Sequence, residues 1–295
     1  MSVNADFEKV SMTAKLTAYM RQYSDIPFAQ DVARYIQAEK AIQRLQQAES
    51  FNMDELLWYA PFFEARYKSI AKIIENQGFQ QVLELASGLS LRGLAMTLRD
   101  PVLIYVETDL PELTEQKQAL LDELILDGRF SYPKNHHFTV ANALDEVQLK
   151  NATQHFQPDQ PLAIVTEGLI QYLSREEIEQ LAQRVCGLLK TFGGVWITPD
   201  FALRQVAQPV SETHRRFRKA IADETGRTIY QDSFETQEEM LAFFERMELS
   251  VQWFSQVEVA PPLSSLDVLT LKTLPYWERI QAKLPVWVLS LRNLN

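Results

Sequence analysis

The sequence predicts an α/β protein built on a doubly wound, mainly parallel sheet. From residue 81 onward, short continuous apolar runs alternate with amphipathic helical stretches, which is the pattern of parallel strands joined by helical crossovers. Hydrophobic residues make up 46% of the 295 residues, which is enough for a large core. With only nine glycines and 13 prolines, the chain does not have the composition of a collagen-like or low-complexity protein.

Five apolar runs are predicted to be the first five strands of this sheet. They cover residues 81–86, 101–107, 137–141, 161–168 and 195–200. Since these runs are apolar throughout rather than alternating, each strand should be buried on both faces.

Helical stretches separate the predicted strands. They cover residues 92–98 and 113–128, followed by a helix that begins at Ser174 and ends at the Gly193–Gly194 pair. Ser174 and Glu177 have the spacing of a capping box, in which each side chain accepts a hydrogen bond from the other residue's backbone N–H. These helices should cover both faces of the sheet.

A helical region is predicted before the first strand. Residues 1–78 contain no strand-like alternation, Pro27 can open one of the helices, and Gly78 can cap the last of them. We therefore expect residues 1–80 to form a helical cap and residues 81–295 to form the α/β domain.

The α/β pattern is interrupted after residue 200. A helix from Ser211 to Gly226 is predicted as an insertion, and a second helix should begin at the Thr236–Glu239 capping spacing. Residues 250–259 and 285–291 are predicted as the closing strands. We expect the inserted segment, residues 201–235, to form a lid.

Charge and cysteine content exclude several classes of function. There are 29 basic and 39 acidic residues, a net charge of −10, so no nucleic-acid partner is expected. No apolar run approaches the ~18 residues of a membrane span, and the polar start of the sequence does not resemble a secretory signal. A cytoplasmic protein without a membrane partner is expected.

The few cysteines and histidines argue against a metal site. Cys186 is the single cysteine, so neither an intrachain disulfide nor a cysteine zinc cluster can form, and we expect it to be a small core residue. The adjacent His136 and His137 should point to opposite faces of a strand, which suits no shared metal ion. No metal is predicted.

Polar residues at the ends of the first two strands mark the expected ligand site. Ligands of open parallel sheets bind at the carboxyl ends of the strands. Glu84 lies in the first strand, and Gly88 in the following turn would let the backbone approach a ligand closely. Glu107 and Asp109 end the second strand and suit a contact with ribose hydroxyls. From spacing alone, an ordinary turn and two surface acids remain an equal alternative.

The turn after the first strand disfavours two other enzyme classes. Ala86 and Ser90 occupy the outer positions where a dinucleotide-binding loop has glycine, so a nicotinamide oxidoreductase is not expected. No G-x-S-x-G elbow occurs in the sequence, so a hydrolase of that type is not expected either.

Five segments together resemble a known family. They are VSMTAKLTAYMR followed by DIPFA, then FEARYKSI, VLELASGLSLRG, YVETDLPELTEQK and VTEGLIQYL. In this order they resemble the leucine carboxyl methyltransferase-like branch of the class I S-adenosylmethionine-dependent methyltransferases, over about residues 9–200. That branch includes bacterial O-methyltransferases of polyketide biosynthesis. The resemblance implies a Rossmann-like methyltransferase sheet with S-adenosylmethionine as cofactor.

The same resemblance assigns roles to residues near the cofactor. Gly88 would pack against the cofactor, and Asp109 or Glu107 would hold the ribose. Arg66 and Lys15 would bind the carboxylate of its methionine part.

Further residues receive roles at the two ends of the cofactor. Glu84 would lie near the amino group and Glu167 near the methionine end. Asn142, followed by Ala143, stands where the family has an acid that accepts from the adenine amino group, and the Asn carbonyl can also accept. Ser90 replaces the usual Asp of the loop.

Methyl transfer is an in-line displacement in which alignment of the two reactants carries much of the acceleration. Glu167 and Tyr172 could stabilise a sulfonium cation, and Tyr172 is the candidate catalytic residue. A carboxylate acceptor is already ionised at neutral pH, whereas a phenol would benefit from a general base. No residue is assigned as that base.

The expected function is methyl transfer to a small-molecule carboxylate or hydroxyl. Protein C-terminal carboxyl methylation is the first alternative, and a cofactor-binding protein without catalysis is the second. Aromatic residues near the N-terminus could line the acceptor pocket or pack in the core. They are Tyr19, Tyr23, Phe28, Phe62 and Phe63.

Overall fold

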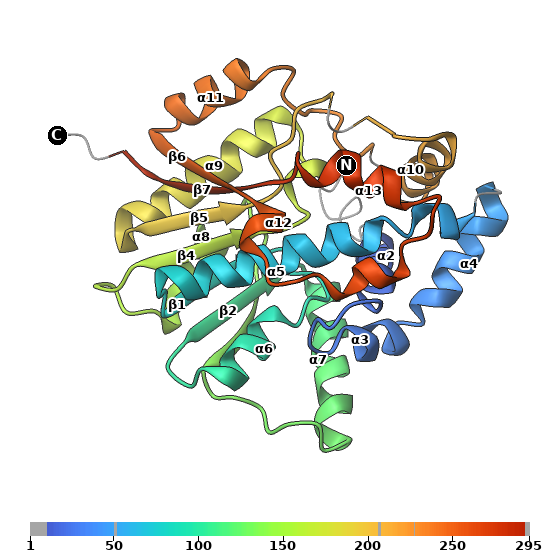
Figure 1. Cartoon of the computed structure of the whole chain (residues 1–295). Helices are drawn as coiled ribbons and strands as arrows, with labels where there is room; N and C mark the ends of the chain where they lie inside the picture. Colours follow the sequence, from blue (N-terminus) through green and yellow to red (C-terminus); the bar gives the residue numbers. More distant parts are fainter. Residues whose placement is uncertain (1–10, 50–51, 206–207, 227, 293–295) are drawn as a thin grey trace.

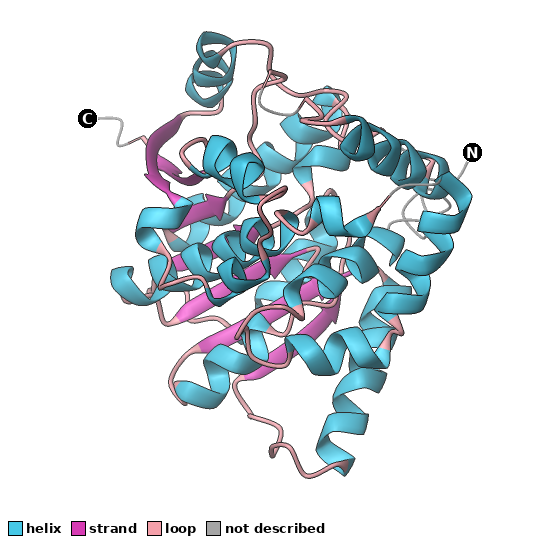
Figure 2. Ribbon diagram, turned by 45° about the vertical axis from the view of Figure 1, so that its right-hand side comes forward, coloured by secondary structure: helices cyan, strands magenta, loops and turns pink. Residues whose placement is uncertain are grey.

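Seven strands form one sheet with helices on both faces (Figure 1, Figure 2). The computed structural model describes residues 11–49, 52–205, 208–226 and 228–292. The strands are β1 (Gln81–Leu85), β2 (Ile104–Asp109), β3 (His136–Val140), β4 (Leu162–Thr166), β5 (Gly194–Thr198), β6 (Leu249–Ser255) and β7 (Pro285–Leu291). The first ten residues of the predicted cap lie outside the described part of the chain.

The strand order is β3-β2-β1-β4-β5-β7-β6. The first five strands pair in parallel, and β7 lies antiparallel between β5 and β6. The order reverses between β1 and β4, so a crevice forms at the carboxyl ends of these two strands. The predicted doubly wound sheet is confirmed.

The helices before the sheet gather on the ligand side of the molecule. They are α2 (Ser11–Arg21), α3 (Ala29–Tyr35), α4 (Ala38–Glu49), the 3-10 turn η2 (Met53–Leu56) and α5 (Tyr59–Gln77). The long helix α5 runs across the front of the sheet in Figure 1, and α2, α3 and α4 lie to its right.

The remaining helices alternate with the strands or follow β5. The alternating ones are α6 (Arg92–Arg99), α7 (Pro111–Leu126), α8 (Glu146–Ala152), η3 (Thr153–His155), η4 (Ile170–Tyr172) and α9 (Arg175–Phe192). Those after β5 are α10 (Glu212–Thr225), α11 (Gln237–Arg246), α12 (Gln256–Val259), η5 (Ser264–Val268) and α13 (Leu274–Gln281).

Successive side chains of β1 pack into two separate hydrophobic cores, one on each face of the sheet. Leu83 of β1 packs with α8, α9 and α11, whereas Val82 packs on the opposite face with α5. This follows from the two-residue period of a strand, which turns successive side chains to opposite faces. Cys186 of α9 is buried in the first core, as expected.

Several predicted helix ends are confirmed. Ser174 and Glu177 form a complete capping box at the start of α9. Gly78 ends α5 with a φ of 70°, in the left-handed region that glycine adopts without strain. The inserted helix α10 is capped by Ser211 and ends at Gly226.

Three local predictions are wrong in detail. Pro27 does not open a helix, because α3 begins two residues later, after Phe28 as its N-cap. Residues 256–259 form α12 rather than the end of a strand, and the Ala260 N–H donates to Gln256 O (2.9 Å) to close this helical turn. At α11, Thr236 caps the helix, but the Glu239 carboxylate accepts from Glu235 N–H (2.8 Å) instead of completing the box.

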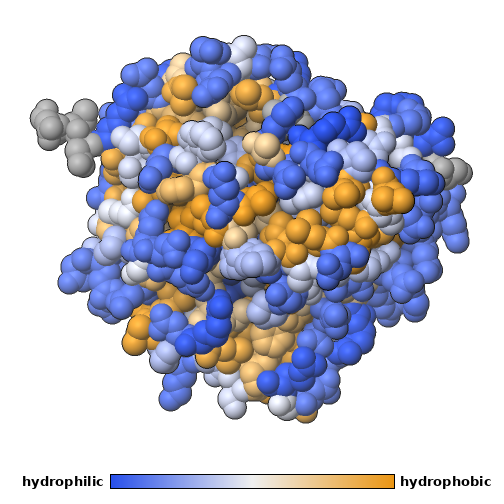
Figure 3. Space-filling model, in the orientation of Figure 1, coloured by the Kyte–Doolittle hydropathy of each residue, from blue (hydrophilic) through white to orange (hydrophobic). Residues whose placement is uncertain are grey.

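The predicted division at residue 80 stays a prediction. In the structure, the N-cap residue Trp58 and Phe62 in the first turn of α5 pack among the aromatic residues near α13. Ile70 and Ile74, farther along the same helix, pack on the sheet. The helices α12 and α13 lie against α5, and Figure 3 shows hydrophobic side chains gathered across this region.

Candidate cofactor and acceptor site

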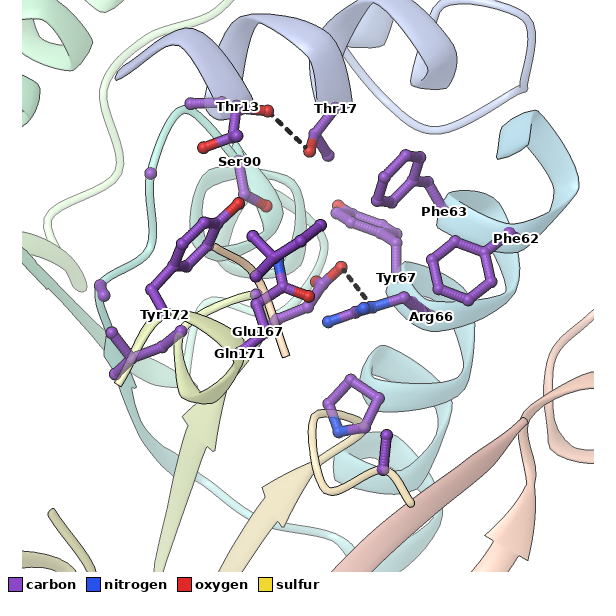
Figure 4. Close-up of a pocket in the computed structure, with 18 of the residues that line it drawn as sticks. Thr13, Thr17, Phe62, Phe63, Arg66, Tyr67, Ser90, Glu167, Gln171 and Tyr172 are labelled. Carbon is purple, nitrogen blue, oxygen red and sulfur yellow. Dashed lines mark hydrogen bonds and ion pairs between the residues drawn. The ribbon is translucent and has the colours of Figure 1, made fainter. Parts of the chain in front are cut away.

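A cavity of about 520 Å³ lies at the carboxyl ends of the central strands. Its floor comes from the turns after β1, β2, β3 and β4, and its walls come from α2, α5 and α10. Figure 4 shows Arg66 and Tyr67 of α5 facing Glu167, with Phe62 and Phe63 farther along the same helix and Tyr172 opposite. This is the place that the strand order selects for a ligand.

The turn after β1 is held open by two residues with left-handed backbones. Ala86 has a φ of 51° and Gly88 a φ of 56°. A Cβ at Gly88 would meet no protein atom within 4 Å, so the side facing the cavity is free of protein. Left-handed backbone at a residue other than glycine is strained, and such strain is concentrated at functional sites.

Asp109 ties the end of β2 to this turn. Its carboxylate accepts hydrogen bonds from the backbone N–H groups of Gly88 (2.6 Å) and Leu110 (2.8 Å). Burial raises the pKa of Asp109, although both N–H groups act in the opposite direction. Each oxygen retains a lone pair for a further donor, because an ionised carboxylate offers about four acceptor positions.

Glu107 lies two residues earlier and does not line the cavity. Its carboxylate is paired with Lys117, accepts from the Gly93 N–H (3.0 Å) and lies 3.3 Å from His136 Nε2. Burial alone would raise the pKa of Glu107, but Lys117 and His136 outweigh it and lower the pKa to about 2. Its charge is therefore already used inside the core.

Glu167 is surrounded by three arginines from three different helices. It pairs with Arg21 of α2 and Arg92 of α6, and Arg66 Nε of α5 lies 3.7 Å from the same carboxylate (Figure 4). Burial would raise the pKa of Glu167, yet the three guanidinium groups lower it to about 2. Glu167 thus joins four segments of the chain at the end of β4.

Each of these arginines has one buried donor without a hydrogen bond in the described part of the chain. Nε of Arg21, Arg66 and Arg92 has no hydrogen-bond partner among the described residues. Arg21 and Arg66 both line the cavity. A cavity with buried, unpaired guanidinium donors suits an anionic group such as a carboxylate.

Glu84 also lines the cavity, and its carboxylate is partly occupied. It pairs with Arg92 and accepts from the Tyr105 hydroxyl (2.5 Å). Burial raises the pKa of Glu84 in spite of Arg92.

Asp200, at the end of β5, is a site residue that the sequence analysis missed. Its carboxylate pairs with Arg66 and accepts from three successive backbone N–H groups, those of Gly168 (2.8 Å), Leu169 (2.8 Å) and Ile170 (3.1 Å). It therefore fixes both the loop after β4 and the Arg66 side chain. An acid at the end of an apolar run predicted as a buried strand was the available signal.

The other predicted residues divide between the cavity and its surroundings. Asn142 and Ala143 line the cavity after β3, whereas Lys15 does not line it although α2 does. Asn142 Oδ1 accepts from the Leu144 N–H (2.9 Å). Tyr172 lines the cavity, and burial raises its pKa to about 12, so its hydroxyl stays protonated at neutral pH.

The N-terminal aromatic residues also divide. Phe62 and Phe63 line the cavity together with Trp58 and Tyr59. The remaining three pack elsewhere, with the Tyr23 hydroxyl donating to Tyr19 (3.1 Å) and Phe28 against Phe130.

More than half of the sequence matches a known protein family. The family model described as "Leucine carboxyl methyltransferase" matches residues 14–186. The chain belongs to this family. The match covers the turns after β1, β2, β3 and β4, which form the floor of the cavity.

Individual proteins with similar sequences are also described as methyltransferases. A putative S-adenosyl-L-methionine-dependent methyltransferase of Mycolicibacterium gilvum is 31% identical over 51% of this chain and 45% of its own length. Leucine carboxyl methyltransferase 1 of Eremothecium gossypii is 27% identical over 42% of each chain. The matched region thus spans about half or less of these relatives. At the level of the family, the predicted methyltransferase class and S-adenosylmethionine cofactor are confirmed.

Comparison with solved structures supports the fold. A duf574 family protein from Streptomyces avermitilis aligns with a TM-score of 0.55 at 13% identity, covering 95% of this chain and 97% of that one. Among the described residues, no three His, Cys, Asp or Glu side chains are grouped to hold a metal ion. None of the described helices has the length and apolar character needed to cross a bilayer.

Proposed function

We propose that this protein is an S-adenosylmethionine-dependent O-methyltransferase acting on a small-molecule carboxylate or hydroxyl. One observation carries the proposal: a single cavity joins a charged half at the strand ends to an aromatic half on α5 and α10. The first half suits a cofactor with ribose and amino-acid groups, and the second suits an apolar acceptor.

The charged half fits the cofactor residue by residue. Asp109 retains a lone pair on each oxygen for the ribose hydroxyls, beside the open turn at Gly88. Nε of Arg21, which has no hydrogen-bond partner among the described residues, would bind its carboxylate together with the Arg66 guanidinium. Since Glu107 is engaged in the core and Lys15 does not line the cavity, Asp109 and Arg21 replace them in this proposal.

Methyl transfer would depend on how the cofactor and the acceptor are placed, rather than on a reactive side chain of the protein. When bound, the cofactor supplies an electrophilic methyl group whose C–S bond breaks as an acceptor oxygen forms the new C–O bond. Glu167 remains ionised at the end of β4, and Tyr172 remains a protonated hydrogen-bond donor. The aromatic wall excludes water, and alignment of the two reactants supplies much of the acceleration.

A small molecule is favoured over a protein terminus by the walls of the aromatic half. Residues from α2, α5 and α10 line it together, including Phe63 and Phe217. The family name points to protein carboxyl methylation as the second candidate. Polyketide-like acids and phenols, on the one hand, and peptides with a free C-terminal leucine, on the other, are the acceptors to compare.

Calorimetric titration with S-adenosylmethionine and S-adenosylhomocysteine, with NAD and NADP as controls, tests the cofactor. Saturable binding of the first pair alone is expected. Asp109→Asn should weaken it by at least about tenfold, because a hydrogen bond to a charged group contributes about 1.5–3 kcal/mol. The matched control is Asp159→Asn, at an exposed position that does not line the cavity. Binding of NAD alone would refute the proposal, and transfer of labelled methyl to the two acceptor sets separates the candidates.

A further inference from the structure

Tyr59 and His214 form a directed pair on the aromatic half of the cavity. Tyr59 Oη lies 2.6 Å from His214 Nε2, and the Val210 backbone N–H donates to His214 Nδ1 at 3.0 Å. A backbone N–H can only donate, so Nδ1 must be unprotonated. In neutral histidine the ring proton is then on Nε2, and His214 donates to the Tyr59 oxygen.

The direction of this bond leaves the Tyr59 proton available. Burial lowers the pKa of His214 to about 3, so the ring stays neutral and keeps this tautomer. Burial also raises the pKa of Tyr59, so the phenol keeps its proton. Since His214 already donates to Oη, the Tyr59 O–H must donate elsewhere. Within the described chain no acceptor for it is recorded, and Tyr59 lines the cavity.

Trp58 supplies a second donor beside the first. Its Nε1–H is buried and has no hydrogen-bond partner among the residues that the structure describes. The Trp58 ring stacks on Tyr59 with centroids 4.0 Å apart, and Trp58 lines the same cavity. A buried donor without a partner is unfavourable by about 1–3 kcal/mol, so the Trp58 N–H next to the Tyr59 hydroxyl indicates a ligand that accepts from both.

The rings around Tyr59 hold its hydroxyl in place. Phe63 stacks on Tyr59 with ring centroids 5.5 Å apart. The Phe62 ring lies edge-on to Tyr59 with centroids 5.8 Å apart, and the Phe217 ring is tilted against it with centroids 5.5 Å apart. A side chain fixed in this way loses little entropy when it binds a ligand. The same rings offer flat apolar surface to the body of an acceptor.

We propose that Trp58 Nε1–H and Tyr59 O–H bind the two oxygens of a carboxylate on the methyl acceptor, with His214 as the residue that positions Tyr59. This assignment rests on the proposed methyltransferase function and specifies its acceptor side. Arg218 of α10 lines the same part of the cavity and adds positive potential there. His214 cannot act as a general base while Nδ1 accepts from Val210, which favours an acceptor that is already ionised.

The test uses protein saturated with S-adenosylhomocysteine and matched pairs of probes. The pairs are benzoate with benzyl alcohol, cinnamate with cinnamyl alcohol, and decanoate with decanol, each titrated calorimetrically. At least one carboxylate should bind about tenfold or more tightly than its alcohol. Tyr59→Phe should weaken that carboxylate by about ten- to a hundredfold, since one hydrogen bond to a charge is lost. Binding of the alcohol and of S-adenosylhomocysteine should not change.

Two variants of His214 separate positioning from a merely structural role. Gln at position 214 keeps an N–H near the place of Nε2, so His214→Gln should stay within about threefold of wild type. His214→Leu removes the N–H that donates to Tyr59, so the Tyr59 hydroxyl is no longer oriented toward the ligand. The carboxylate affinity of this variant should therefore fall by about as much as that of Tyr59→Phe. Tyr19→Phe is the matched control, since Tyr19 does not line the cavity.

The outcomes distinguish this assignment from the function on which it rests. If S-adenosylhomocysteine binds but no carboxylate does, the assignment is overturned and the cofactor site stands. It is also overturned if Tyr59→Phe binds the carboxylate as tightly as wild type does. Failure of wild-type protein to bind S-adenosylhomocysteine overturns both.

Discussion

The buried carboxylates near this site differ in their hydrogen-bond and ion-pair partners, and therefore in what each can do. Glu107 is paired inside the core, Glu167 gathers three arginines, and Asp200 combines Arg66 with three backbone N–H groups. Asp109 alone among these four accepts only from backbone N–H groups. This difference makes Asp109 the acid best able to exchange partners with a ligand.

Asp200→Asn should lower the free energy of unfolding by about 3–5 kcal/mol, because it removes one charge of a buried pair and leaves Arg66 short of a partner. Urea unfolding measures this change. The control is Glu245→Gln, whose pair with Arg292 (3.1 Å) is exposed and should contribute about 0–1 kcal/mol. Equal effects of the two substitutions would contradict the structural role of Asp200.

The residue types at the strand ends were enough to predict much of the charged half of the cavity. They did not predict which basic residue of α2 lines it. Lys15 and Arg21 both lie on α2, and six helical residues turn a side chain by about 240°, so only one can face the strand ends. That phase is set by packing of α2 on its neighbours. Glu107 and Asp109 share a strand face, and the position of α7 with Lys117 decided which was covered.

At the scale of elements, α6 approaches β2 so closely that only glycine fits at its second residue. A Cβ on Gly93 would lie 2.4 Å from Glu107 Oε1 and 2.7 Å from the Tyr105 ring. The Gly93 N–H also donates to Glu107 (3.0 Å). The helix that follows the ligand-binding turn is therefore fixed to the core by this contact.

Gly93→Ala should destabilise the protein by about 1–3 kcal/mol through overpacking. Gly187→Ala in α9 is the matched control, because its Cβ would meet nothing within 4 Å and alanine favours a helix by up to about 1 kcal/mol. Thermal and urea unfolding of both variants would check this. A Gly93→Ala protein as stable as wild type would show that α6 can move away from β2.

Apolar runs and caps located most elements, and the misplaced ends have local causes. The strand predicted from residue 101 begins at Ile104, because the Val102 N–H bonds to Asp100 Oδ1 (3.0 Å) and forms a turn first. Residues 256–259 are predicted as strand, but β6 ends at Ser255 and the Ala260 N–H donates to Gln256 O (2.9 Å), which closes the helical turn α12. A short apolar run such as QVEV fits a strand as well as one helical turn, so the local pattern does not separate the two.

For the whole molecule, Glu167 should make stability depend on pH. Its pKa of about 2 lies below the ordinary 4.5, so the unfolded chain binds more protons in between. The stabilisation is complete above about pH 4.5 and is lost as the pH falls toward 2. Glu167→Gln should therefore be less stable than wild type by about 3 kcal/mol at pH 7, and less so at pH 3.

Urea unfolding of both proteins at pH 7, 4 and 3 would measure this difference. The Glu245→Gln protein serves again as the exposed control, with a difference from wild type close to zero throughout. A Glu167→Gln deficit that is the same at pH 7 and pH 3 would contradict the role of the three arginines.

The inserted helix α10 has an evolutionary consequence. It begins at its own cap, Ser211, and ends at its own glycine, Gly226, and it contributes to the aromatic half without supplying any strand. The turns that would hold the cofactor follow β1 to β4 and precede this helix in the chain. If the aromatic half binds the acceptor as proposed, changes confined to residues 201–235 would alter the acceptor range and leave the strand-end residues unchanged. Family members with the same strand-end residues are then expected to differ most in this segment and to act on different acceptors.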